Sequence, residues 1–149
     1  MKIVRTTSTN QDFIALVALL DADLAIRDGE DHSFYDQFNK ISQIKYVVVA
    51  YENDKPLGCG AIKEYDSNTM EIKRMYVSSD CRGKGIASKV LSELESWTTE
   101  LGYNKCILET GYKQPEAIAL YKKRAFRLTT NYGQYTGVEN SLCFEKKLV

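Results

Sequence analysis

The sequence predicts a single α/β (α+β) domain, residues 1–149, with a mixed, mostly antiparallel sheet of six to seven strands and about four flanking helices. Three strand-like segments joined by short polar turns follow one another between residues 46 and 77, as in an antiparallel meander. A segment of helical periodicity then leads to a further strand, and such a connection places the two strands parallel. The length is that of one domain with its own core.

The N-terminal part predicts a strand, a helix and an acidic connection. Residues 2–6 have the composition of a short strand. Thr9 and Asp12 form a helix-capping pattern, and apolar residues with helical spacing follow it. These are Phe13, Val17, Leu20 and Leu24. The stretch 21–36 is strongly acidic, and we expect it to contain the end of this helix, a loop and a short helix near residues 34–40.

The meander comprises the strands 46–51, 57–63 and 70–77, with turns at residues 53–56 and 66–68. Apolar residues then recur with a period of 3.6, which predicts a helix that begins near Gly85 and ends at Gly102. This stripe consists of Ile86, Val90, Leu94, Trp97 and Leu101.

The C-terminal part predicts three strands and one helix. Residues 105–110 form a strand that we expect to lie parallel to the last strand of the meander. Pro115 stands at the first position of a further helix, where proline is favoured. Residues 126–130 and 141–148 close the sheet around a loop rich in glycine and tyrosine.

Composition argues against several classes of protein. Lys and Arg together number 20, as do Asp and Glu, so the formal net charge is zero and no basic field favours nucleic acid. The four cysteines are scattered without a CxxC pair, so we expect no metal site. There is no apolar run of about 18 residues and no signal-peptide pattern, so we expect a cytoplasmic protein that does not bind membranes.

The loop 78–88, between the third meander strand and the long helix, has the features of a phosphate cradle. Gly83 and Gly85 let backbone N–H groups turn inward, and the helix N-terminus adds unpaired N–H groups. Arg82 and Lys84 can supply positive charge at its rim. The competing interpretation is a flexible helix N-terminus that binds no ligand.

Two common phosphate loops fit less well. A Walker A loop needs GxxxxGK[ST], which is absent. A Rossmann fingerprint would need Ser88 as its third small residue, and here residues 78–82 intervene between the strand and the first glycine. The preceding meander is also not a βαβ arrangement.

The strand before this loop changes parity. Its apolar residues are even-numbered at the start (Met70, Ile72) and odd-numbered at the end (Met75, Val77). Because strand side chains alternate strictly, the change indicates a β-bulge near Lys73-Arg74. Such a bulge would make the parallel strand diverge and open a wedge. A central strand buried on both faces would explain the pattern equally well.

Together these residues resemble the GNAT superfamily of N-acetyltransferases. The signature Arg/Gln-x-x-Gly-x-Gly/Ala stands here as Arg82, Gly85 and Ala87, and the similarity extends through residues 71–77 and 114–121. Two departures are Gln114, where the family usually has Asn, and Ala125-Phe126, where it has Gly-Phe. The resemblance implies the GNAT fold, with a splayed parallel pair of strands, and acetyl-CoA bound in the wedge with no metal.

The resemblance also implies site residues. Coenzyme contacts are expected from Met75, Tyr76, Val77, Arg82, Gly83, Lys84, Gly85, Ile86, Ala87, Ser88, Gln114 and Tyr121. Tyr121 matches the tyrosine that protonates the leaving thiolate, and Glu71 matches a catalytic glutamate that some members carry. An ordinary exposed strand glutamate is the competing interpretation of Glu71, and Glu109 is an alternative base. A backbone N–H near Met75 is expected to hold the oxyanion, and Cys81 is expected to be passive.

The sequence says less about which residues would bind the acceptor amine. The acidic stretch 21–36 could attract a cationic amine or be a solvated face, and the lone His32 is expected at the surface. A loop containing Tyr132, Gly133, Tyr135 and Gly137 could cover the acceptor as a mobile lid or be a hairpin tip.

The function implied is an acetyl-CoA-dependent N-acetyltransferase that acetylates a primary amine of a small molecule or peptide by direct transfer in a ternary complex. A homodimer is possible for this family. The alternative is a non-catalytic acetyl-CoA sensor, and a third interpretation is a toxin that acetylates protein or tRNA. Retention of Tyr121 favours the enzyme.

Overall fold

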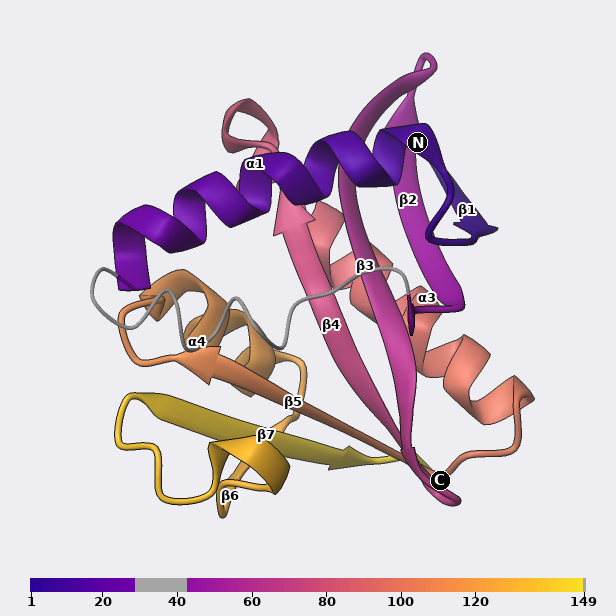
Figure 1. The fold of residues 1–149 in the computed structure, drawn as a ribbon. Helices are drawn as coiled ribbons and strands as arrows, with labels where there is room; N and C mark the ends of the chain where they lie inside the picture. The colour runs from indigo at the N-terminus through magenta and orange to yellow at the C-terminus, as the bar shows by residue number, and fades with distance from the viewer. Residues whose placement is uncertain (29–42, 149) are drawn as a thin grey trace.

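The computed structural model describes residues 1–28 and 43–148, which form a seven-stranded mixed sheet with three α-helices (Figure 1). The strands are β1 (Lys2–Thr6), β2 (Tyr46–Glu52), β3 (Lys55–Asp66), β4 (Thr69–Val77), β5 (Lys105–Gly111), β6 (Arg127–Thr129) and β7 (Ser141–Lys147). The helices are α1 (Gln11–Asp28), α3 (Ile86–Glu100) and α4 (Pro115–Lys123), with 3-10 turns η3 (Ser79–Cys81) and η4 (Gly133–Tyr135). The predicted fold class is confirmed.

The sheet order is β1-β2-β3-β4-β5-β7-β6, and only the β4–β5 pair is parallel. A tight turn joins β2 to β3 at Asn53 and Asp54, whose φ angles of 50° and 66° are those that a two-residue hairpin requires. The turn is therefore shorter than the predicted 53–56, and β3 already begins at Lys55.

The predicted bulge in β4 is confirmed. The register passes from Ala61 opposite Lys73 to Cys59 opposite Tyr76, so β4 advances by three residues while β3 advances by two. Arg74 occupies the extra position with a φ of 60°, which is unusual for a residue with a side chain.

Strands β4 and β5 also separate as predicted. They pair at only three positions, where Thr69, Met70 and Glu71 face Lys105, Cys106 and Ile107. Beyond these positions β4 continues to Val77 and β5 continues to Gly111. Figure 1 shows that the two strands diverge from the lower end, where they are paired. The divergence opens the wedge between them.

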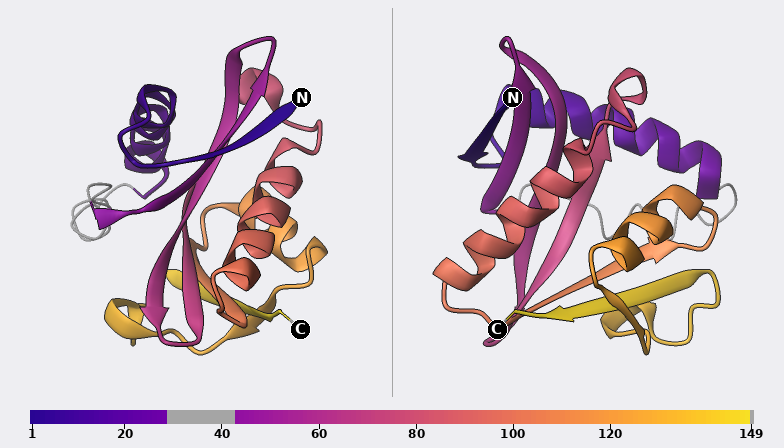
Figure 2. Two further views of the ribbon diagram at one scale, coloured as in Figure 1. Left: turned by 90° about the vertical axis from the view of Figure 1, so that its right-hand side faces the viewer. Right: turned by 180° about the vertical axis from the view of Figure 1, so that it is seen from behind.

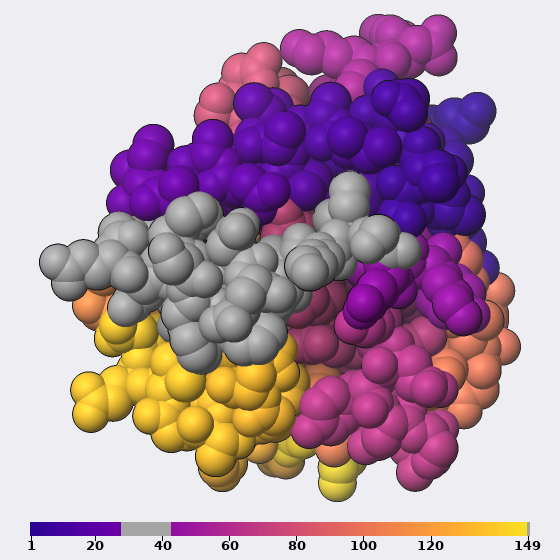
Figure 3. Space-filling model, viewed as in Figure 1, coloured from indigo at the N-terminus to yellow at the C-terminus, as the bar shows by residue number. Residues whose placement is uncertain are grey.

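The helices form layers on both faces of the sheet. Helix α1 lies across one face, and α3 and α4 cover the other (Figure 2). In the space-filling view of the α1 face, α1 lies above the C-terminal strands (Figure 3). The core between α1 and the sheet includes Phe13, Leu16, Val17, Val47, Val49, Cys59 and Ala61. The core beneath α3 includes Val48, Ile62, Met70, Ile72, Ile86, Val90, Leu91 and Leu94.

The residue that caps helix α1 differs from the predicted one. The side chain that caps α1 is Asn10, whose Oδ1 accepts a hydrogen bond from the Phe13 N–H at 2.9 Å, and not the predicted Thr9. The Thr9 hydroxyl instead bonds to the Thr7 hydroxyl at 2.8 Å. The short helix expected near residues 34–40 lies outside the described residues.

Helix α4 ends in a left-handed residue that is not glycine. Ala125 has a φ of 71°, and the Phe126 N–H reaches the Tyr121 carbonyl at 2.9 Å, which closes the helix end in a Schellman-type turn. The turn also draws Phe126 into the core, so β6 begins at Arg127 and is shorter than the predicted strand 126–130. The left-handed conformation costs a residue with a Cβ about 1–2 kcal/mol.

Replacing this alanine should therefore stabilise the protein. We expect Ala125→Gly to raise the free energy of unfolding by about 0.5–1 kcal/mol, because relief of the strain exceeds the added chain entropy of the unfolded state. Urea unfolding followed by the fluorescence of the single tryptophan, Trp97, measures it. The matched control Ala119→Gly, at an exposed position inside α4, should lower the same quantity by about 1 kcal/mol. A lower stability for Ala125→Gly contradicts the explanation.

Candidate functional site

The loop before α3 has the backbone geometry of an anion cradle. Gly83 and Gly85 have φ angles of 82° and 78°, and a Cβ atom added to either would meet no atom within 4 Å. Glycine is therefore favoured here by backbone conformation and not by crowding. Gly85 is the N-cap of α3 and provides no side-chain cap, so the first N–H groups of the helix are left for another partner.

Arg82 fixes this loop to the end of β4. Its Nε donates a hydrogen bond to the Val77 carbonyl at 3.0 Å, and its guanidinium lies 5.6 Å from the centre of the Tyr76 ring. The sequence predicted only that Arg82 supplies positive charge at the rim of the cradle. The two contacts show that it also holds the loop in place. Cys81, beside it, is a buried thiol with its Sγ 3.5 Å from Asp80 Oδ1.

A cleft of about 290 Å³ lies in the wedge next to the cradle. All the predicted coenzyme residues except the exposed Lys84 line it: Met75, Tyr76, Val77, Arg82, Gly83, Gly85, Ile86, Ala87, Ser88, Gln114 and Tyr121. The prediction missed Leu20, Asp23, Cys81, Glu116, Ala117 and Leu120, which also line it. Helical spacing from Tyr121 could have indicated Ala117, whereas no local signal indicated the two α1 residues.

A second, smaller cleft of about 110 Å³ adjoins the first. The two share Leu20, Met75, Gln114, Ala117 and Tyr121, so they meet at the point where β4 and α4 face each other. The second cleft is further lined by ionisable side chains, namely Glu71, Lys73, Arg74, Glu109 and Tyr135. An elongated ligand in the first cleft would therefore end next to a polar chamber.

Tyr121 stands at this junction. It is 6% exposed, and its ring packs against Phe126 and Phe144 with centroids 5.8 Å and 6.2 Å apart. Burial raises the pKa of Tyr121 above its ordinary value of 10, and the carboxylate of Glu109 adds to the shift. The hydroxyl is therefore protonated at neutral pH.

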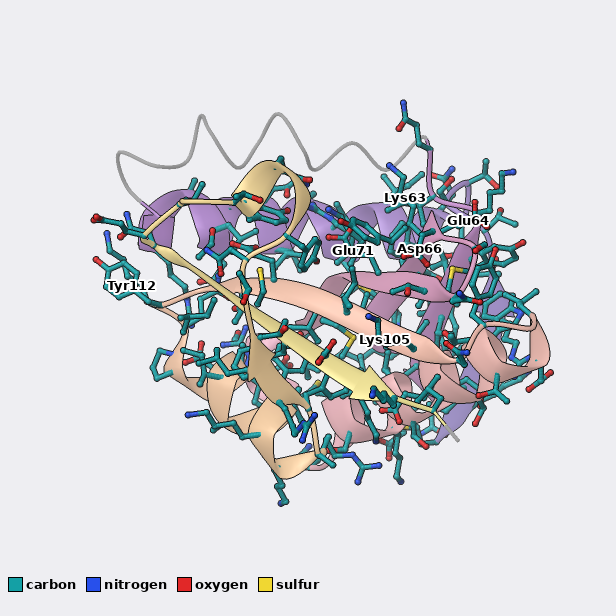
Figure 4. The ribbon with its side chains drawn as sticks, turned by 90° about the horizontal axis from the view of Figure 1, so that it is seen from below. Lys63, Glu64, Asp66, Glu71, Lys105 and Tyr112 are labelled. Carbon is teal, nitrogen blue, oxygen red and sulfur yellow. The ribbon has the colours of Figure 1, made fainter. Side chains whose placement is uncertain are left out.

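Glu71 is not an ordinary exposed glutamate. It is 8% exposed. Figure 4 shows it on the face of the sheet that is turned towards α1. Its Oε2 accepts a hydrogen bond from the Tyr132 hydroxyl at 2.6 Å, and its Oε1 lies 3.9 Å from Lys73 Nζ. The structure thus places a buried, hydrogen-bonded carboxylate in the second cleft.

The two cations of this cleft, Lys73 and Arg74, were not predicted as site residues. Burial lowers the pKa of Lys73, against the opposing effect of Glu71 and Glu109. Arg74 is 6% exposed, and its guanidinium forms an ion pair with Asp21 of α1. Only the bulge indicated that this part of β4 was special, and it did not indicate these contacts.

The described part of the acidic stretch is engaged in ion pairs. Asp21 bonds to Arg74, and Asp23 lies 3.2 Å from Arg27 of the same helix. Both carboxylates are paired with an arginine and partly exposed to solvent, which fits the solvated face that was one of the two interpretations of this stretch. The remainder of the stretch, with His32, lies outside the described residues.

The predicted aromatic loop lies against the second cleft. Tyr132 bonds to Glu71 and Tyr135 is 3% exposed, so both point inward and the loop is more than a hairpin tip. The loop is closed by its own hydrogen bonds, with Asn131 Nδ2 donating to the carbonyls of Val138 and Ser141 at 2.9 Å and 3.1 Å.

The cysteines are buried free thiols. Burial raises the pKa of Cys59 to about 12 and the pKa values of Cys106 and Cys143 to about 11, which suppresses the nucleophilic thiolate. Within residues 1–28 and 43–148, no three His, Cys, Asp or Glu residues gather in a group that could hold a metal ion. No helix in that part of the chain has the length and apolar character needed to cross a membrane.

Comparisons with known proteins agree with this geometry. Residues 14–126 match the sequence profile described as the acetyltransferase (GNAT) family. An IAA acetyltransferase of Azospirillum brasilense is 35% identical over 102 residues, which cover 68% of this chain and 67% of that protein. The uncharacterized N-acetyltransferase YsnE of Bacillus subtilis (strain 168) is 36% identical over 101 residues, covering 66% and 67%.

Solved structures show the same fold. A protein from Klebsiella pneumoniae subsp. pneumoniae MGH 78578, named as an acyl-CoA N-acyltransferase, superposes with a TM-score of 0.84 and 27% identity over 99% of this chain and 97% of its own. The PaiA N-acetyltransferase of Thermoplasma acidophilum, solved with coenzyme A, has a TM-score of 0.71 at 18% identity, with 99% of each chain covered. Sequence, fold and site together show that the chain belongs to the GNAT family of acetyltransferases.

Proposed function

We propose that this acetyl-CoA-dependent N-acetyltransferase acetylates a primary amine of a small molecule or peptide by direct transfer in a ternary complex. The observation that carries the proposal is the meeting of the two clefts at Met75 and Tyr121. A donor in the wedge and an acceptor in the polar chamber would approach each other there, so the reaction needs no relay through the protein.

The wedge offers partners both for the pyrophosphate of coenzyme A and for its amide-bearing arm. The uncapped N–H groups after Gly85 suit a pyrophosphate, with Arg82 and Lys84 at the rim. The length of β4 from Met75 to Val77 has no pairing with β5, so it lies open to an extended amide-bearing arm. When bound, acetyl-CoA supplies a thioester carbonyl as the acetyl donor.

Glu71 is the proposed general base. An alkylamine of lysine type is protonated at neutral pH, about three units below its pKa, so forming the free amine costs roughly 4 kcal/mol. A buried carboxylate in the acceptor chamber can accept that proton directly or through one water molecule. Glu109 lines the same chamber but lies on β5, so it is the second candidate for this role.

Tyr121 is the proposed general acid. Its buried hydroxyl lines both clefts and keeps its proton at neutral pH, so it can protonate the sulfur as the thiolate leaves. The backbone N–H of Met75, at the bulge, is the proposed donor to the oxygen on which negative charge develops.

A primary amine as the acceptor, a homodimer and a cytoplasmic location are predictions from the sequence.

The first test is turnover with acetyl-CoA and a panel of primary amines, followed by release of free thiol. We expect at least one amine to be acetylated, and Tyr121→Phe to lower kcat about tenfold or more, because the leaving thiolate loses its proton donor. The matched control is Tyr112→Phe, which removes a hydroxyl from an exposed residue and should keep wild-type turnover. Equal rates for Tyr121→Phe and wild type would remove Tyr121 from its role.

The second test concerns the base. We expect Glu71→Gln to lower kcat/KM for the amine roughly 100-fold at pH 7, because a general base typically contributes 10²- to 10⁴-fold. The deficit should shrink as the pH rises towards the pKa of the acceptor amine, since the free amine then forms without help. Glu52→Gln, which neutralises an exposed glutamate at the end of β2, is the control. A deficit of the same size at every pH argues for a structural effect instead.

The third test separates direct transfer from an acetyl-cysteine intermediate. Cys81→Ala should retain wild-type kcat, because its buried thiol is not required as a nucleophile. Intact-mass measurement after incubation with acetyl-CoA alone should show no acetylated cysteine. Loss of turnover in Cys81→Ala together with an acetylated thiol in the wild type would replace direct transfer with a two-step mechanism.

A further inference from the structure

Tyr132 bonds to the candidate base from a distant part of the chain. It lies between β6 and β7, 61 positions after Glu71, and its hydroxyl donates to Glu71 Oε2 at 2.6 Å. This length is typical of a strong hydrogen bond from a hydroxyl to an ionised carboxylate. None of the features that relate the sequence to the GNAT family includes this residue.

The ring of Tyr132 is held from two sides. It makes edge-to-face contacts with Tyr65 and Tyr135, with centroids 5.2 Å and 5.7 Å apart. Its carbonyl accepts a hydrogen bond from the Tyr135 N–H at 2.9 Å, which starts the η4 turn. The preceding Asn131 ties the loop together through the carbonyls of Val138 and Ser141. The hydroxyl is therefore presented to Glu71 by a packed loop.

The chemistry of the contact is one-directional. Burial, followed by the neighbouring Glu71 carboxylate, raises the pKa of Tyr132 far above its usual range, so the hydroxyl acts as the donor at every working pH. An ionised carboxylate has about four acceptor positions, so this bond occupies one of them and leaves Oε1 able to accept a proton. Lys73 Nζ lies 3.9 Å from Oε1 of the same carboxylate.

We propose that Tyr132 is a positioning residue for acetyl transfer, which holds the Glu71 carboxylate in a single orientation in the second cleft. The inference rests on the proposed role of Glu71 as the base. It makes the β6–β7 loop part of the proton-transfer apparatus, although the loop supplies no group that takes the substrate proton itself. The competing explanation is that the hydrogen bond only fastens the loop to the sheet.

The test compares Tyr132→Phe with Tyr65→Phe. Both substitutions keep an aromatic ring in the same cluster, but only the first removes the hydroxyl bound to Glu71. With the best amine of the panel, we expect Tyr132→Phe to lower kcat about tenfold at pH 7 with little change in KM, because the Glu71 carboxylate is no longer held in one orientation. The Kd for coenzyme A should stay within twofold of wild type, as should every value for Tyr65→Phe.

A double substitution shows whether Tyr132 acts through Glu71. If it does, Tyr132→Phe should have no further effect on kcat/KM in the Glu71→Gln background, whereas independent effects would multiply. A readout that needs no turnover is the ¹³C chemical shift of the Glu71 carboxyl carbon at pH 7, which should change in Tyr132→Phe, where the hydrogen bond is lost, and keep its wild-type value in Tyr65→Phe.

The outcomes separate this inference from the proposed function. If Glu71→Gln lowers turnover but Tyr132→Phe leaves both kcat and the chemical shift of the Glu71 carboxyl carbon unchanged, the positioning role is wrong and the base stands. A loss in Tyr132→Phe that persists in full in the Glu71→Gln background, together with lower stability, shows that the bond only fastens the loop. If Glu71→Gln turns over like wild type, the base is wrong, and the positioning role is overturned with it.

Discussion

One extra residue in β4 determines the geometry of the site. Because side chains alternate along a strand, an inserted residue changes which face every later side chain meets. Before the bulge, Ile72 packs into the core beneath α3, and after it Met75 joins the same core. Between them, Lys73 contacts Glu71 and Arg74 contacts Asp21 of α1, so two consecutive side chains serve the α1 face. A regular strand would present only one of them.

The same bulge accompanies the separation of β4 from β5. Pairing stops after Glu71, three residues before Arg74, and both strands run on without each other. Unpaired strand backbone is normally a liability inside a fold, because each buried N–H and C=O group needs a partner. Here the edge borders the wedge cleft, so an extended ligand can supply the missing partners. A feature that interrupts the sheet thus borders the cleft of the wedge.

Local sequence signals predicted the backbone of this arrangement. The parity change predicted the bulge, the two glycines predicted the cradle, and Pro115 predicted the start of α4, because each depends on residues close together in the chain. The side-chain pairs were not predicted. Arg74 and Asp21 are 53 positions apart, and Tyr132 and Glu71 are 61 apart, so no spacing rule connects them. The cap of α1 was misplaced by one residue because Thr9 and Asn10 are both competent caps.

These long-range pairs explain how a chamber with so many charges can be buried. An isolated charge in the interior is strongly unfavourable, whereas one that is paired or hydrogen-bonded is tolerated. Asp21 compensates Arg74, and Tyr132 satisfies one oxygen of Glu71 without neutralising it. Lys73 Nζ lies 3.9 Å from the other oxygen of Glu71, so this carboxylate has both a hydroxyl and a cation as partners. The loop between β6 and β7 therefore supplies one of the partners that allow the Glu71 side chain to be buried.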